Sequence, residues 1–259
     1  MNILSIGDIV SSEGCGFLRS KLPRLKKEKN IDIVIANGEN SADGNGILPH
    51  SANHIFSSGV DIITTGNHAF RRKEIYSLFN ENDYLIRPAN YPNNTTPGKG
   101  YCILDLRFTK ICVINLMGTI YLENLNCPFR TIDEILDLDE VKDTDIKIVD
   151  FHAEATAEKR ALGFYLDGRV SAIYGTHTHI QTADECILEN GTAYITDLGM
   201  TGVINSVLGV TKETSIARMK NKLPIRFEQA KGPCKMDCIL TNIEYKSGKA
   251  LSIERLQIK

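Results

Sequence analysis

Runs of apolar residues alternate with amphipathic segments along the first 90 residues of the chain. The apolar runs are rich in isoleucine and valine and predict strands near residues 2–7, 32–37, 61–65 and 84–87. Apolar positions at helical spacing predict three helices between these strands. The first carries Leu18, Leu22 and Leu25, the second lies near residues 49–58, and the third carries Ile75, Leu78 and Phe79. This alternation predicts a sheet that is covered by helices.

The rest of the chain adds strands that do not follow this alternation. Residues 101–106 and 111–116 are predicted to form a hairpin through the polar link 107–110. Further strands are predicted near 146–151, 171–175, 193–197, 236–244 and 250–258, and helices near 130–138, near 154–165 and after Thr211. These strands indicate a second sheet, so we expect an α/β protein with two mixed sheets face to face and helices outside.

The ends of five predicted strands carry residues that bind metal ions. Four of the runs lead into a glycine followed by ligand-type side chains: Gly7-Asp8, Gly38-Glu39-Asn40, Gly66-Asn67-His68 and Gly175-Thr176-His177-Thr178-His179. The fifth run ends at His152. Two imidazoles separated by one residue can point to different ions in one pocket. The pattern therefore predicts a dinuclear metal site, and its assembly from both halves of the chain predicts one domain, residues 1–259.

The residue types at these positions suit a particular chemistry. Carboxylate and amide oxygens mixed with imidazoles favour iron, manganese or zinc, and disfavour copper(I) or an iron–sulfur cluster. Two such ions about 3.5–4 Å apart promote the hydrolysis of phosphate esters, in which a bridging hydroxide attacks phosphorus. A proton donor near the leaving oxygen assists its departure. Glycines beside the ligands allow the backbone to turn sharply there.

Single residues of this set also have structural interpretations. Asp8 could cap a loop, Asn67 could occupy a turn, Asn40 could cap a helix, and His152 could lie in the core. His50 and His54 have the spacing of a helical metal site, but no carboxylate pattern accompanies them, and a surface helix is the better interpretation. Three polar residues could either orient ligands or serve structure: Asp150, Glu154 and Thr178.

Composition and charge exclude several other classes of protein. The 259 residues are 42% hydrophobic and 24% charged, with a net charge of −2, which gives no sign of a surface for duplex nucleic acid. No apolar run approaches the roughly 20 residues that cross a membrane, and the N-terminal sequence lacks the pattern of a signal peptide. The seven scattered cysteines fit reduced thiols. We therefore expect a cytoplasmic protein without membrane association.

An ordered set of motifs covers nearly the whole chain. Besides the strand-end motifs it includes Arg87-Pro88-Ala89-Asn90, Asp150-Phe151-His152-Ala153-Glu154-Ala155-Thr156, Gly175 through Asp184, and Thr196-Asp197-Leu198-Gly199-Met200-Thr201-Gly202. With these motifs the sequence resembles the calcineurin-like metallophosphoesterases and, more closely, the bacterial YmdB-like family, which hydrolyses 2′,3′-cyclic nucleotides. The chain departs from these patterns at Val10, where the wider superfamily often has histidine, and at Ala69-Phe70-Arg71, where close relatives often have Thr-Trp-Asp.

The resemblance implies a four-layer α/β/β/α sandwich and a specific role for each candidate site residue. Glu39 would bridge two metal ions, with iron favoured over manganese or zinc. Asp8, Asn40 and His179 would complete one coordination shell, and Asn67, His152 and His177 the other. His68 would be the catalytic residue that assists the leaving group. The implied partner is a small cyclic nucleotide or another phosphate ester, and relatives lead us to expect a homo-oligomer.

Two alternatives to a cyclic-nucleotide phosphodiesterase remain open at this point. A phosphomonoesterase could use the same site. The chain could instead be a regulatory module whose metal site is not catalytic. The complete ligand set together with His68 argues against this second alternative, because a site that is no longer used is expected to lose ligands.

Overall fold

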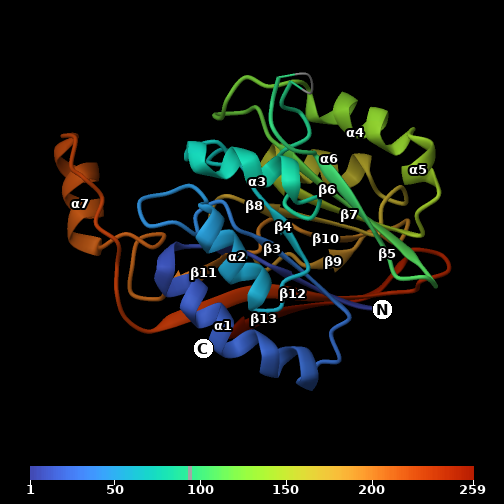
Figure 1. Ribbon diagram of the computed structural model, residues 1–259, viewed down its shortest axis with the longest axis horizontal. Coiled ribbons are helices and arrows are strands. Elements are labelled where there is room, and N and C mark those ends of the chain that lie inside the picture. Colours follow the sequence, from blue (N-terminus) through green and yellow to red (C-terminus); the bar gives the residue numbers. More distant parts are fainter. Residues whose placement is uncertain (93–94) are drawn as a thin grey trace.

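Two mixed β-sheets lie face to face and helices cover their outer sides, as the computed structural model in Figure 1 shows. The structure describes residues 1–92 and 95–259. The predicted α/β/β/α sandwich is therefore confirmed. No described helix is long and apolar enough to cross a lipid bilayer.

The first sheet has seven strands and is built mainly from the two ends of the chain. Its order is β2-β11-β12-β1-β3-β4, with β13 also paired to β12. The strands are β1 (Asn2–Ile6), β2 (Asp8–Ile9), β3 (Ile33–Asn37), β4 (Ile62–Thr64), β11 (Met200–Val203), β12 (Cys234–Ile243) and β13 (Ala250–Ile258). β1, β3 and β4 are parallel, so their carboxyl ends lie at one edge.

The second sheet has six strands from the middle of the chain, in the order β5-β6-β7-β8-β10-β9. They are β5 (Tyr101–Asp105), β6 (Lys110–Met117), β7 (Ile146–His152), β8 (Ala172–Thr176), β9 (Cys186–Ile187) and β10 (Ala193–Ile195). β5 and β6 form the predicted hairpin, while β6, β7, β8 and β10 run parallel.

The central strands are apolar on both faces because each face lies against another layer. In β1, for example, Ile3 packs between the two sheets, whereas Leu4 packs under the helices. On the first sheet these helices are α1 (Ser11–Glu28), α2 (Pro49–Ser57) and α3 (Tyr76–Glu81). On the second they are α4 (Pro128–Leu136), α5 (Asp139–Lys142) and α6 (Thr156–Tyr165). The remaining helix, α7 (Lys212–Asn221), stands away from the sheets.

One predicted strand is wrong. Within the described part of the chain, residues 84–87 make only a single bridge, between Ile63 and Leu85, although Leu85 and Ile86 are fully buried. Pro88 follows directly and has no N–H to continue a ladder, which ends the pairing. The helix predicted near 130–138 is α4, which begins and ends two residues earlier, whereas α5 and the short strands β2, β9 and β11 were not predicted.

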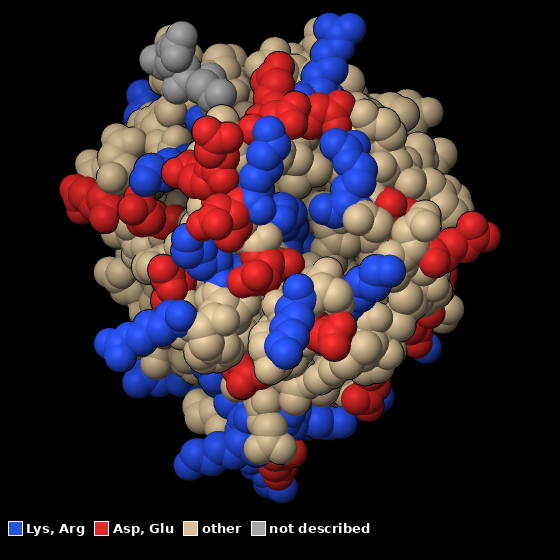
Figure 2. Space-filling model, turned by 90° about the vertical axis from the view of Figure 1, so that its right-hand side faces the viewer, with Lys and Arg blue, Asp and Glu red and all other residues tan. Residues whose placement is uncertain are grey.

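Charges of both signs are mixed on the face shown in Figure 2, where Lys and Arg alternate with Asp and Glu. A cavity of about 360 Å³ is lined by Lys147, Arg169, Asn190 and Lys249, but by none of the eight predicted site residues. All seven cysteines have free thiols, and only Cys127 is exposed. Burial raises the pKa of the Cys15 and Cys112 thiols to about 12, so both remain protonated and unreactive.

Candidate metal centre

The eight predicted site residues meet at one edge of the sandwich. Asp8 lies in β2 directly after β1, while Glu39 and Asn40 follow β3, and Asn67 and His68 follow β4. His152 ends β7, and His177 and His179 follow β8. The two sheets thus each deliver ligand-type side chains from the carboxyl ends of parallel strands, where open α/β sheets place their binding sites.

Glu39 lies at the centre of this group. Its carboxylate is fully buried, and Oε1 accepts a hydrogen bond from Asn40 Nδ2 at 2.9 Å. The same oxygen lies 3.4 Å from His152 Nε2 and 3.2 Å from His68 Nδ1. Oε2 accepts the backbone N–H of His68 at 2.9 Å. One carboxylate therefore contacts residues from both sheets.

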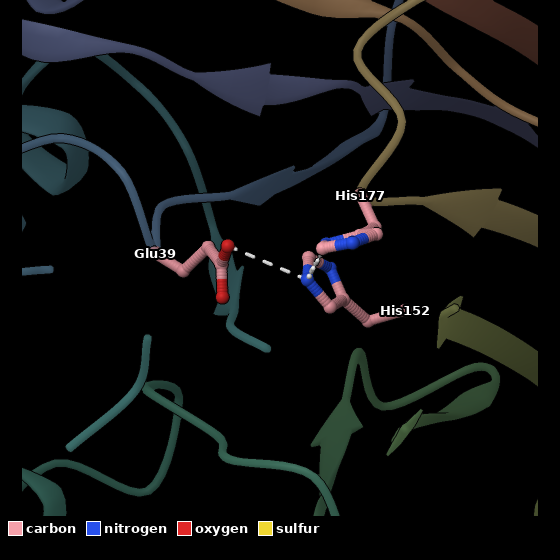
Figure 3. A group of neighbouring side chains, drawn as sticks. All are labelled: Glu39, His152 and His177. Carbon is pink, nitrogen blue, oxygen red and sulfur yellow. Dashed lines mark hydrogen bonds and ion pairs between the residues drawn. The ribbon is translucent and has the colours of Figure 1, made fainter. Parts of the chain in front are cut away.

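His152 has more acceptors around one ring nitrogen than a single proton can serve. Its Nε2 lies 2.9 Å from Asn67 Oδ1, 3.0 Å from His177 Nδ1 and 3.4 Å from Glu39 Oε1. Figure 3 shows the Glu39 carboxylate and the two imidazoles turned toward one another. Ligand atoms of these three residues all lie within 4.8 Å of one another. A cation among them would satisfy all of these lone pairs, so the donor set fits a metal ion.

Asp8, Asn40 and His179 form a second group, which contacts Glu39 through Asn40. His179 Nε2 lies 3.4 Å from Asn40 Nδ2 and 3.5 Å from Asp8 Oδ1. Two buried atoms, Asp8 Oδ1 and His179 Nδ1, find no hydrogen-bond partner among residues 1–92 and 95–259. Burying such polar atoms is unfavourable unless a ligand satisfies them. The carboxylate of Asp8 and the imidazole of His179 therefore also fit a cation, and oxygen and nitrogen donors of this kind bind iron, manganese or zinc.

The loop that carries His177 and His179 has a strained backbone. Both residues have positive φ angles, 96° and 63°, which side chains other than glycine rarely adopt. Hydrogen bonds stabilise this backbone conformation. His177 N donates to Asp8 Oδ2 at 3.1 Å, and Thr178 donates to Asp197 through N and Oγ1. Strained residues of this kind concentrate at functional sites.

Asp197 links this loop to a helix. Its Oδ2 accepts a hydrogen bond from Lys159 Nζ of α6 at 2.7 Å, and both side chains are almost completely buried. Its Oδ1 accepts the Gly199 N–H at 2.9 Å. The motif Thr196-Asp197 was recognised in the sequence, but neither this role nor the partner Lys159 was predicted, because lysine on an amphipathic helix is usually exposed.

Three polar residues have two interpretations in the sequence, and each is linked to the candidate ligands: Glu154 contacts His177, Asp150 reaches His152 through Thr176, and Thr178 lies in the ligand loop. Asp150 accepts hydrogen bonds from Thr64 at 2.5 Å and from Thr176 at 2.7 Å, and Thr176 Oγ1 lies 2.9 Å from His152 Nδ1. Glu154 Oε2 lies 2.9 Å from His177 Nε2. Such partners orient imidazoles toward a metal.

The carboxylates and imidazoles of the site shift one another's protonation. Burial alone would raise the pKa of Glu39, but His152 and His68 outweigh it and hold that pKa well below 4.5. Burial would keep His152 neutral, yet Glu39 and Asp8 raise its pKa to about 9. Burial and the charge of His152 lower the pKa of His177 to about 4. A cation would compete with the proton on His152.

Two features of the sequence lie outside this group. His50 and His54 belong to α2, where His54 Nε2 contacts the carbonyl oxygen of Cys15 at 3.2 Å. Ala69 is fully buried, and Phe70 packs on Tyr76 and Phe79, so these two residues contribute to the core.

A cavity of about 210 Å³ opens beside Glu39, His68, His177 and His179, and Val10 also lines it.

The chain is similar to known proteins over its whole length. Residues 4–256 match the model of a family described as YmdB-like protein. The chain is 45% identical over 258 residues to a Bacillus subtilis (strain 168) protein named 2′,3′-cyclic-nucleotide 2′-phosphodiesterase, covering 100% of this chain and 97% of that protein. A hypothetical protein from Thermus thermophilus is 39% identical with a TM-score of 0.92, covering 99% of this chain and 98% of that one. A Mycoplasma pneumoniae structure described as a novel phosphatase is 32% identical with a TM-score of 0.93, covering 100% and 93%.

Proposed function

The chain belongs to the YmdB-like protein family, and from this membership we propose that it is a metal-dependent phosphodiesterase that opens 2′,3′-cyclic nucleotides. The observation that carries the proposal is the crowding of Glu39, His152 and His177 around one point at the edge of two sheets. Because this edge takes residues from both sheets, we also treat residues 1–259 as one domain.

Seven residues would hold two metal ions, with iron as the first candidate and manganese or zinc as alternatives. Glu39 would lie between the ions, because its carboxylate contacts both groups of ligands. Asp8, Asn40 and His179 would bind one ion, and Asn67, His152 and His177 the other. When bound, such ions act as Lewis acids on the phosphoryl oxygens and supply a nucleophile derived from water at neutral pH.

His68 would donate the proton that the leaving oxygen needs. Its Nδ1 lies 2.9 Å from Asn40 Oδ1, which accepts the N–H and fixes the ring, and the side chain is 27% exposed where it lines the cavity. The other ring nitrogen would then give its proton to the ribose oxygen as the bond between that oxygen and phosphorus breaks. Opening at the 2′ oxygen would leave a 3′-phosphate and a free 2′ hydroxyl.

The direct test is turnover of 2′,3′-cyclic AMP by the purified, metal-loaded protein. We expect release of 3′-AMP, loss of turnover on treatment with a chelator, and recovery when metal is restored. Chromatography of the products measures all three. No turnover by protein that contains metal would reject this substrate class, and faster hydrolysis of nucleotide or sugar monophosphates would instead identify a phosphomonoesterase.

His68→Asn should reduce kcat for 2′,3′-cyclic AMP by about 10²–10⁴-fold, the usual contribution of a general acid. Asparagine keeps a donor for Asn40 but has no second nitrogen to protonate the leaving oxygen. The loss should be much smaller for bis(p-nitrophenyl) phosphate, since nitrophenolate leaves without a proton. Metal content, measured by elemental analysis, should match that of the wild type. Equal losses on both substrates would show that His68 does not act as the proton donor.

A further inference from the structure

One cavity joins the candidate metal centre to a segment that stands away from the sheets. This segment, residues 204–233, connects β11 to β12, contains α7, and is called the arm below. Figure 1 shows α7 at its outer end, separated from the body of the molecule. The cavity of about 210 Å³ is lined by Glu39, His68 and His177 together with residues of the arm. Whatever enters it therefore meets both.

The arm presents apolar side chains to this cavity. Leu208, Met219 and Phe227 line it, although they are 40%, 65% and 48% exposed. They lie on a segment that otherwise carries many charged residues, among them Lys212, Arg218 and Lys220. Apolar side chains gathered at the mouth of a polar site are typical of a surface that binds a ligand.

Contacts at the base of the arm keep this wall in place. Thr211 N donates to the carbonyl oxygen of Glu228 at 2.9 Å, and Ala230 N donates to that of Gly209 at 2.9 Å. Gly209 has a φ of 92°, and a Cβ there would overlap Val10, so the absence of a side chain lets the arm reach the residues beside Asp8.

The ring of Phe227 is oriented by Arg218. The guanidinium carbon of Arg218 lies 4.3 Å from the ring centroid, a cation–π contact. Arg218 lines a neighbouring hollow together with Leu223 and Pro224, and this hollow shares Ser215, Met219 and Phe227 with the cavity beside the metal centre. The guanidinium does not line the cavity beside the metal centre, whereas the Phe227 ring does, so a ligand in that cavity can contact the ring.

Gln229 adds one polar group to the apolar wall. It lines the cavity, and its Oε1 is buried without a hydrogen-bond partner in the described part of the chain. A buried amide oxygen without a partner is unfavourable, and an N–H group of a ligand would satisfy it. The ligand that fits this wall is thus a flat, uncharged ring with an N–H at its edge.

We propose that this cavity is the nucleobase subsite of the enzyme, with the base stacked against Phe227 and Met219 and an N–H of the base donated to Gln229. The inference rests on the proposed function, because a cyclic nucleotide carries its anionic phosphate and its neutral base at opposite ends. The phosphate would meet the metal centre and the base would meet the arm. Stacking accepts every base, so the wall would bind nucleosides with little preference among them.

The test compares 2′,3′-cyclic AMP with methyl β-ribofuranoside 2′,3′-cyclic phosphate, which lacks the base. Phe227→Ala should raise KM for the nucleotide about tenfold, equivalent to about 1.4 kcal/mol, with kcat within about twofold of the wild type. The ratio of kcat/KM for the nucleotide to kcat/KM for the base-free diester should fall by the same factor. Met219→Ala should lower the same ratio, and it provides a second test in case Phe227→Ala disturbs the structure of the arm. Gln229→Met should raise KM for the nucleotide several-fold by removing the acceptor.

Ile216→Ala is the matched control, since Ile216 lies on α7 and is 58% exposed but does not line the cavity. It should leave the selectivity ratio unchanged. The proposal is overturned if Phe227→Ala and Met219→Ala keep the ratio of the wild type.

Binding of adenosine, measured by saturation-transfer NMR, separates this inference from the proposed function. Adenosine contacts should appear with the wild type and weaken with Phe227→Ala, even if neither diester is hydrolysed. If hydrolysis fails but adenosine binds as expected, the phosphodiesterase activity is rejected and the base subsite is still supported. Absence of adenosine binding, or binding that Phe227→Ala leaves unchanged, would reject the subsite.

Discussion

Glu39→Gln is expected to lower kcat/KM for 2′,3′-cyclic AMP by at least roughly a thousandfold, about 4 kcal/mol of transition-state stabilisation. Glutamine has nearly the same shape but no charge, and its amide nitrogen cannot bind a cation. Because the carboxylate contacts Asn40, His68 and His152, its neutralisation affects both groups of ligands at once. Elemental analysis should therefore find the metal content strongly reduced.

The matched control is Glu154→Gln, the same chemical change at a carboxylate that is half exposed and contacts only His177 within the site. A partner that orients a ligand usually contributes 10–100-fold, so we expect a loss of about tenfold. Circular dichroism should show both variants folded. Equal losses in the two variants would contradict a central position for Glu39. A cellular effect that survives Glu39→Gln would instead favour a regulatory module.

Lys159→Met should destabilise the fold by about 3–5 kcal/mol, because it removes one partner from a buried ion pair. Lys159 Nζ lies 2.7 Å from Asp197 Oδ2, and the side chains are 1% and 0% exposed. Methionine fills the space, and among the described residues it leaves the carboxylate the hydrogen bonds from Thr178 and Gly199. For a chain of this size we expect the melting temperature to fall by roughly 10 °C, measured by calorimetry.

Two variants check the cause of this loss. Lys142→Met breaks an exposed pair with Asp137, with side chains 55% and 81% exposed, and should cost less than about 1 kcal/mol. Adding Asp197→Asn to Lys159→Met removes the unpaired charge and should restore part of the stability. If Lys142→Met lowers the melting temperature as much as Lys159→Met, burial of the pair is not the cause.

The sequence predicts that the candidate site residues meet at one place because they follow the ends of predicted strands, and the structure brings these residues together. Ile33–Asn37 is almost wholly apolar and Ile146–His152 is mostly so, despite Lys147 and Asp150, which predicts buried strands. The structure shows that both strands are paired in parallel and end at the edge where Glu39 and His152 meet. Individual roles among Asp8, Asn40 and Asn67 followed from family resemblance, since an isolated asparagine after a strand is equally typical of a turn.

Other features depend on contacts between distant parts of the chain, which local patterns do not encode. The apolar run at 84–87 matches a strand, yet Pro88 ends its pairing. Two-residue strands such as β2 and β9 exist only because a neighbour lies beside them. Lys159 satisfies the pattern of a surface helix, and only the fold shows that Asp197 lies next to it.

The arm begins and ends on adjacent antiparallel strands, with Val203 paired to Cys234 and Gly202 to Lys235. Its two ends thus lie side by side on paired strands of the first sheet. Exchange of the arm as a unit should therefore leave the strands beneath the candidate metal centre paired as they are. Chimeras that carry the corresponding segment of a relative offer a direct route to altered substrate range without redesign of the catalytic framework.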